Sequence, residues 1–157
     1  MAALDTMLVV ALVANGLLAG LFFAFSCAVS PALGRLDDRS FVEAFRSINT
    51  VIVNGWFLAV FLLAPLMAVA AAATAGLSHR PSFWWLVAGA ACAVATFVIT
   101  AALNVPLNQA LDAALTTTTA QYETTRTAFE TAWNRWNLAR TLTSLGALAL
   151  LAGASVR

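Results

Sequence analysis

The chain has 157 residues, of which 62% are hydrophobic and 10% charged, and its mean hydropathy is +0.88. Soluble domains are about 45–50% apolar, so this composition indicates an integral membrane protein. The net charge is +1 and the basic residues, all arginines, are scattered along the chain, which argues against a nucleic-acid partner. One domain over residues 1–157 is expected for this length.

Four segments are apolar enough, at about 20 residues each, to cross a membrane as helices. The expected spans are residues 7–30, 51–75, 83–103 and 138–156. The expected fold class is therefore all-α, an integral membrane four-helix bundle with both termini on one face. The two long connections share the opposite face and carry most of the arginines. This bias predicts that they are cytoplasmic, as in a multi-pass protein of a bacterial plasma membrane.

The first long connection, "GRLDDRSFVEAFRSINT", places Phe41, Phe45 and Ile48 at helical spacing. That pattern predicts an amphipathic helix. The residues just before it are suitable helix caps: Asp37, Asp38 and Ser40.

The second long connection, "LNQALDAALTTTTAQYETTRTAFETAWNRW", repeats large apolar residues at multiples of about 3.5. The repeat predicts an interfacial or bundle-extending helix, and it continues through the weak helix formers Thr116–Thr119. The last expected span then continues a helix that begins outside the hydrocarbon. The apolar residues of this stripe are Leu111, Leu115, Tyr122, Phe129, Trp133 and Trp136.

Polar and aromatic residues share one face where this connection meets the last span. Taken as a helix, Glu130, Trp133, Trp136, Asn137 and Arg140 lie at offsets 0, +3, +6, +7 and +10. An arginine at the centre of a membrane helix costs roughly 2.5–3.5 kcal/mol on insertion scales, and such residues usually have a function. Arg140 could instead extend to the interface, because it is near the end of its span.

Further polar groups are expected near the same depth. Arg46, Asn49 and Trp56 form a stripe leading into the second span, and "NVPLN" places Asn104 and Asn108 one turn apart. The proline within this motif is expected to kink the helix and free the carbonyl of the residue four positions earlier. We expect Arg46 and Arg140 to approach one shared pocket with these amides.

Other interpretations of these residues stay open. Tryptophans at membrane interfaces are common anchors, which could explain Trp133 and Trp136. Asn15, within the first span, could serve as interhelical glue, worth only about 0.6 kcal/mol on average.

A pocket of arginine, amide and indole donors in an apolar, aromatic cavity suits a flat aromatic ligand that carries oxygen. Such donors would stabilise the negative charge of a phenolate or enolate. His79, the sole histidine, is in the short turn on the other face, and Cys27 and Cys92 lie in apolar runs. A histidine-ligated metal or haem is therefore disfavoured, although a metal or haem held by other ligands stays open.

Four blocks in this order resemble the anthrone oxygenase family, small four-span membrane proteins of aromatic polyketide pathways. The resemblance covers nearly the whole chain. The blocks are "GLFFAFSCAVSPAL" (Gly20–Leu33), "FRSINTVIVNGWF" (Phe45–Phe57), "NVPLN" (Asn104–Asn108) and "WNRWNLART" (Trp133–Thr141).

The resemblance implies a cofactor-independent monooxygenase that oxidises the methylene carbon of an anthrone to the quinone. Dioxygen would be the co-substrate, and no organic cofactor or metal is expected. On this reading Arg46 and Arg140 hold the oxyanion of an enolate. Glu130 is the candidate base, and Glu43 and Asp112 are the other carboxylates expected nearby. The amides that would orient the oxyanion are Asn49, Asn104, Asn108 and Asn137.

The substrate-binding residues expected on the same reading are mostly aromatic: Trp133, Trp136, Trp56, Phe25 and Asn15. The expected partners are a small aromatic substrate and the lipid bilayer, and a homo-oligomer is left open. Two alternatives to the oxygenase remain. One is a non-catalytic membrane module that binds a quinone or a similar amphipathic aromatic, and the other is a purely structural bundle.

Overall fold

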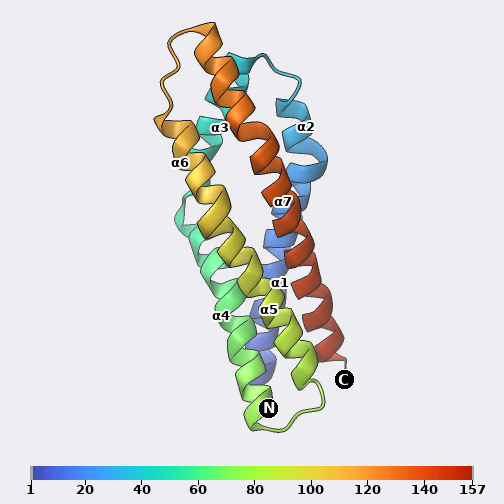
Figure 1. Cartoon of the computed structure of the whole chain (residues 1–157). Helices are drawn as coiled ribbons and strands as arrows, with labels where there is room; N and C mark the ends of the chain where they lie inside the picture. Colours follow the sequence, from blue (N-terminus) through green and yellow to red (C-terminus); the bar gives the residue numbers. More distant parts are fainter. Residues whose placement is uncertain (1, 157) are drawn as a thin grey trace.

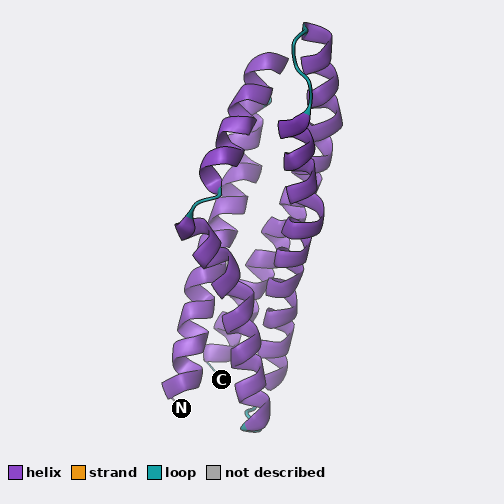
Figure 2. Ribbon diagram, turned by 90° about the vertical axis from the view of Figure 1, so that its left-hand side faces the viewer, coloured by secondary structure: helices purple, strands orange, loops and turns teal. Residues whose placement is uncertain are grey.

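The structure is a computed structural model that describes residues 2–156, and long helices joined by short loops make up this part of the chain (Figure 2). The α-helices are α1 (Ala2–Ala24), α2 (Ser30–Leu33), α3 (Asp38–Ile52), α4 (Gly55–Leu77), α5 (Phe83–Ile99), α6 (Val105–Ala113) and α7 (Thr119–Ser155). Two π-helical turns, η1 (Phe25–Val29) and η2 (Thr100–Asn104), continue α1 and α5 without a break in the helical path.

Four helical stretches are long and apolar enough to cross a membrane: Ala3–Leu33, Gly55–Leu77, Phe83–Ala113 and Thr119–Ser155. They form an elongated bundle in which both termini lie at one end and the two long connections at the other (Figure 1). The all-α, four-span fold class expected from the sequence is confirmed. This arrangement is that of a multi-pass membrane protein.

The bundle is longer than a membrane is thick. The 37 residues of α7 span about 55 Å at 1.5 Å per residue, whereas the hydrocarbon core of a bilayer is about 30 Å thick. The N-terminal part of α7 therefore extends beyond the hydrocarbon, where it packs with α3 and α6 (Figure 1). The last span does continue a helix that begins outside the membrane.

The second span begins later than expected, at Gly55 instead of residue 51. The chain leaves α3 at Val53, whose ψ of 66° is not helical, and Asn54 then caps α4 by accepting a hydrogen bond from the N–H of Phe57. A side-chain cap of this kind ends one helix and begins another, so α3 and α4 are separate helices. At the start of α3, Asp37 accepts a bond from the N–H of Ser40, as a predicted cap.

The predicted continuation of a helix through Thr116–Thr119 is wrong. The residues from Ala114 to Thr118 form a loop, and α7 begins only after Thr118. Thr118 and Gln121 make a reciprocal capping box, which satisfies the free N–H groups of the first turn. The local capping signal outweighs the apolar stripe that runs through this segment.

The proline of "NVPLN" does not interrupt its span. Pro106 stands in the first turn of α6, directly after η2, and the N–H of Val105 donates to the carbonyl of Thr100. The wider π-helical pattern accommodates the missing proline N–H, so the membrane-length helix runs on from Phe83 to Ala113. The first span has the same arrangement, with Pro31 following η1.

The two ends of the bundle have different cores. Small residues pack the end that carries the termini, with Ala68, Ala71 and Ala90 buried against Leu151. Gly89 allows α5 to approach α7, since a Cβ there would lie 2.9 Å from Cγ of Leu151. Small residues of this kind allow membrane helices to pack closely. Large aromatic side chains pack the other end, and the candidate site lies beside them.

Candidate functional site

A cavity of about 90 Å³ lies between the first span, α3, the third span and α7, where α3 ends. All four sequence blocks contribute to its wall. The aromatic wall residues are Phe22, Phe25, Phe45, Phe57 and Trp133, and the polar ones are Asn49, Thr100, Asn104, Asn108 and Arg140. The chain thus brings polar residues that lie up to 91 positions apart in the sequence to one apolar cavity.

Arg140 is the charged residue of the cavity wall and is only 6% exposed. Its Nη2 donates to Oδ1 of Asn137 at 2.9 Å, while its Nε has no hydrogen-bond partner among the described residues. The guanidinium carbon lies 4.3 Å from the ring centroid of Phe22 and 5.3 Å from that of Trp133. No carboxylate within residues 2–156 forms an ion pair with it. The Phe22 and Trp133 rings attract the guanidinium, because aromatic faces attract cations. They do not neutralise its charge, so the buried guanidinium can still bind an anion.

Two asparagines from the third span line the cavity in different states. Asn104 is fully buried, donates weakly to the carbonyl of Trp133 at 3.4 Å, and has an Oδ1 without a partner in the described structure. Asn108 accepts a 2.9 Å hydrogen bond from Nε1 of Trp133 and so fixes the indole ring. Asn104 is therefore available to a ligand, and Asn108 positions the aromatic wall.

Asn49, at the end of α3, connects the cavity to a carboxylate. Its Nδ2 donates to Oδ1 of Asp112 at 3.2 Å, and Asp112 is exposed on α6. Asp112 is not part of the cavity wall, but Asn49, whose amide binds the Asp112 carboxylate, is part of it.

Asn137 stands behind the cavity and orients Arg140. Its Nδ2 donates to the carbonyl of Phe22 at 3.0 Å and to Oγ of Ser26 at 2.8 Å, while its Oδ1 accepts from Arg140. The amide joins α7 to the first span, and its second role is to hold the guanidinium against Phe22. It does not line the cavity itself.

Both π-helical turns border this site. Phe25 in η1 and Asn104 in η2 are wall residues contributed by the turns themselves. Single π-helical turns inside α-helices occur often at functional sites, because the extra residue re-aims the neighbouring side chains.

Arg46 does not reach this cavity, so the expectation that it approaches the same pocket as Arg140 is wrong. Its guanidinium donates to the carbonyls of Leu111 and Ala114 and to Oγ1 of Thr116, at 2.7 to 3.1 Å. These acceptors are at the end of α6 and in the loop that follows. Arg46 thus serves as a cap for α6 that α3 provides.

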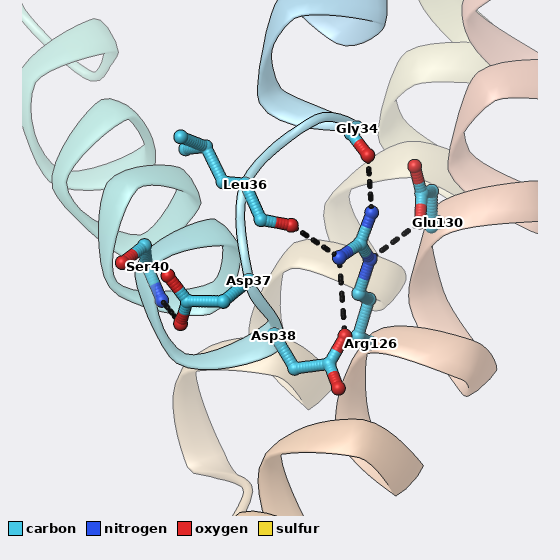
Figure 3. A network of polar contacts seen from close by, with 7 residues as sticks. All are labelled: Gly34, Leu36, Asp37, Asp38, Ser40, Arg126 and Glu130. Atoms are coloured by element: carbon cyan, nitrogen blue, oxygen red, sulfur yellow. Dashed lines mark hydrogen bonds and ion pairs between the residues drawn. The ribbon is translucent and has the colours of Figure 1, made fainter.

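Glu130 is also placed elsewhere. Its Oε2 lies 2.7 Å from Nε of Arg126, which in turn donates to the carbonyls of Gly34 and Leu36 and to Asp38 (Figure 3). This network ties the loop between α2 and α3 to α7. The expected base is therefore occupied in a structural ion pair outside the cavity.

The remaining predicted ligand contacts divide in the same way. Trp133 and Phe25 line the cavity, with ring centroids 5.5 Å apart. Trp56 is 87% exposed and Trp136 is 39% exposed, and neither is part of the wall. Asn15 is fully buried and donates to the carbonyls of Ala11 and Ala64, so it joins α1 to α4 as interhelical glue.

The sequence interpretation missed several wall residues, among them Phe22, Phe57 and Thr100. Phe22 could have been found by its spacing, since it lies seven residues after Asn15 and three before Phe25 on one helix face. Within residues 2–156 there is no group of three or more histidine, cysteine or acidic residues that could hold a metal ion. The metal independence expected from the sequence stays a prediction.

Comparison with known proteins identifies the family. The family model described as anthrone oxygenase matches residues 55–150, which include two of the four blocks and four of the cavity's polar residues. Searches of curated proteins and of solved structures return no match. The family match spans more than half of the chain and agrees with the resemblance seen in the sequence. The chain therefore belongs to the anthrone oxygenase family.

Proposed function

We propose that this protein is a membrane oxygenase that oxidises an anthrone-like polycyclic aromatic with dioxygen to the quinone. The observation that carries the proposal is Arg140, a buried arginine without a carboxylate partner in the described structure, which lines an aromatic cavity with a free Nε. A site of this kind binds an oxygen that becomes negatively charged during the reaction. Family membership supports the reaction type.

The reaction begins when the methylene carbon of the anthrone loses a proton, which leaves a delocalised enolate with its charge on the ring oxygen. Arg140 holds that oxyanion, and the free face of its guanidinium provides the donor. Asn104 orients the ring, with Phe22 and Trp133 beside it. Preorganised donors in an apolar cavity lower the pKa of the substrate because they stabilise the anion and need little reorganisation.

The enolate then passes an electron to dioxygen, and the two radicals combine into a peroxide anion at the former methylene carbon. This anion takes back the proton that was removed in the first step and becomes a hydroperoxide. Loss of water from the hydroperoxide gives the quinone carbonyl. One oxygen atom of dioxygen ends in the quinone and the other in water, and dioxygen accepts all the electrons that the substrate loses. This balance needs no further co-substrate.

The base is assigned anew. Glu130 is replaced in this role by Asp112, the carboxylate that contacts the wall residue Asn49. Because Asp112 is exposed, it can exchange protons with the aqueous phase. Asn49 links its position to the cavity, so a substrate that displaces the amide would meet the carboxylate.

The cavity must widen to admit a three-ring substrate. Ligand pockets usually measure about 300–1,000 Å³, well above the 90 Å³ of this cavity. A groove of about 290 Å³ on the outer side shares Phe25, Ile48 and Ile52 with the cavity wall. Movement of these apolar side chains would join the two spaces and open a path from the membrane interface.

The second candidate, a non-catalytic module that binds a quinone, is favoured by one observation, namely that no carboxylate lines the cavity. Oxygen consumption separates the two. Purified protein supplied with an anthrone should consume one dioxygen per quinone formed, well above the rate without protein. Tight binding of both anthrone and quinone without any consumption of dioxygen would favour the binding module.

A further inference from the structure

A second pocket, of about 450 Å³, also lies against α7 and shares no wall residue with the cavity. Its walls come from η1, α2 and the loop after α2 on one side, and from α7 on the other. Its polar wall residues are Ser26, Ser30, Arg35, Glu130, Asn134 and Asn137. Its volume is in the usual range for ligand pockets.

Three polar side chains of this pocket have no partner among the described residues. Oγ of Ser30 is buried, with the residue only 7% exposed, and makes no hydrogen bond among the described residues. The side chains of Arg35 and Asn134 likewise make no hydrogen bond or ion pair within residues 2–156. A buried hydroxyl without a partner costs free energy, so its presence beside two other unused donors indicates a bound group that accepts hydrogen bonds.

The wall carries one carboxylate and one guanidinium. Glu130 is paired with Arg126 at 2.7 Å, and Arg126 also binds Asp38 and the carbonyls of Gly34 and Leu36 (Figure 3). Arg35 makes no ion pair among the described residues, so its guanidinium is available to an anion. A guanidinium, an amide and a hydroxyl together offer the donors that bind the oxygens of a phosphate.

Its depth corresponds to the lipid headgroups. Asn134 lies 21 residues before Ser155, about 32 Å along α7, while the hydrocarbon core is about 30 Å thick and the bilayer with headgroups about 40–45 Å. The 23 residues of α4 give a similar length, about 35 Å, from Leu77 up to Gly55. The pocket therefore lies at the depth where the hydrocarbon core meets the headgroup region.

An apolar track leads from the pocket into the membrane. Leu138, Leu142 and Leu145 follow Asn134 on one face of α7, at spacings of four, four and three residues. They are 52%, 62% and 42% exposed. Exposed leucines below a polar pocket are the arrangement expected for acyl chains below a headgroup.

We propose that this pocket binds the phosphate group of a phospholipid, with Ser30, Arg35 and Asn134 as the donors. Basic pockets between membrane helices are known to bind lipid headgroups in this way. The inference is independent of the oxidation chemistry of the cavity.

The experiment uses the full chain purified in detergent and native mass spectrometry with dioleoyl phosphatidylglycerol. Dioleoylglycerol, which has the same acyl chains and no phosphate, is the matched ligand. The parent should retain the phospholipid and not the diacylglycerol, and Ser30→Ala and Arg35→Gln should each weaken retention about tenfold. The control is Arg39→Gln, an exposed arginine paired with Glu43 outside the pocket, which should bind like the parent.

Ser30→Ala provides a second readout that rules out misfolding. Because the buried hydroxyl has no partner, its removal should leave the melting temperature of the lipid-free protein unchanged or raise it, even as phospholipid retention falls. Equal retention of the diacylglycerol, parent-like binding by both pocket variants, or an equal loss in Arg39→Gln would overturn the proposal. Displacement of the phospholipid by an equal concentration of glycerol 3-phosphate would overturn the assignment to a lipid.

Discussion

Replacement of Arg140 with methionine should make the protein more stable and at the same time nearly inactive. Arg140 is 6% exposed, and among residues 2–156 it has no carboxylate partner. The buried charge of Arg140 lowers the stability of the ligand-free protein, so its removal should raise stability. The same charge binds the anionic ligand, so its removal should also abolish most of the activity. Methionine fills a similar volume without the charge.

The size of both effects follows from the contacts. A buried arginine costs roughly 2.5–3.5 kcal/mol in a membrane helix, and the bond to Asn137 and the contacts with the Phe22 and Trp133 rings offset about 1–2 kcal/mol of it. The remaining 1–2 kcal/mol, as an order of magnitude, corresponds to a rise in melting temperature of about 2–8 °C for a chain of this size. Loss of an oxyanion donor should lower kcat about 10²–10³-fold.

The assay pairs thermal unfolding in detergent with dioxygen consumption in the presence of an anthrone. Arg46→Met is the matched control, because Arg46 donates to the carbonyls at the end of α6 and lies outside the cavity. It should lower stability by about 1–3 kcal/mol and change the turnover of the folded protein much less. Arg140→Lys should also be poorly active, since a point charge does not reproduce the planar guanidinium. The reasoning is refuted if Arg140→Met loses stability as Arg46→Met does, or keeps more than about a tenth of the parent's turnover.

Three further results are expected. Asn104→Leu should lower kcat roughly tenfold or more, because an orienting amide is lost. The control Asn15→Leu removes hydrogen bonds outside the cavity and should cost about 0.6 kcal/mol of stability with parent-like turnover. Equal effects of the two variants on kcat would remove Asn104 from the site. Arg126→Gln should lower stability by about 1–3 kcal/mol and make the loop after α2 more sensitive to protease, because the bonds of Arg126 to Gly34, Leu36, Asp38 and Glu130 are lost (Figure 3). An unchanged cleavage pattern would contradict this role. Chelator treatment and His79→Ala should both leave dioxygen consumption at the parental rate, and activity that follows the content of a bound metal would overturn the cofactor-independent reaction.

The sequence alone determined the four spans and the central part of the site. Apolar length defines a membrane helix regardless of its neighbours, so the number of spans needed no tertiary information. Trp133 and Arg140 lie within about 20° of each other around α7, at 100° per residue, and both line the cavity. Helical periodicity was sufficient for this pair.

Only the tertiary structure decided which residues on either side of Trp133 and Arg140 line the cavity and which do not. Glu130 and Trp136 stand about 60° on either side of Trp133, and neither lines the cavity. Arg126 holds Glu130 in the wall of the second pocket, and Trp136 is left 39% exposed. The width of the buried face of α7 depends on where the neighbouring helices pack against it. The spacing of residues along the α7 sequence does not contain that information.

The two arginines thought equivalent from sequence differ for the same reason. Arg46 precedes Asn49 by one turn of α3 and was expected at the same depth as Arg140. Its partners are at the end of α6 and in the loop that begins at Ala114, where the last carbonyls of the helix lack N–H donors. These acceptors are 65 or more residues away in the chain, so they come within reach of Arg46 only once the helices have assembled.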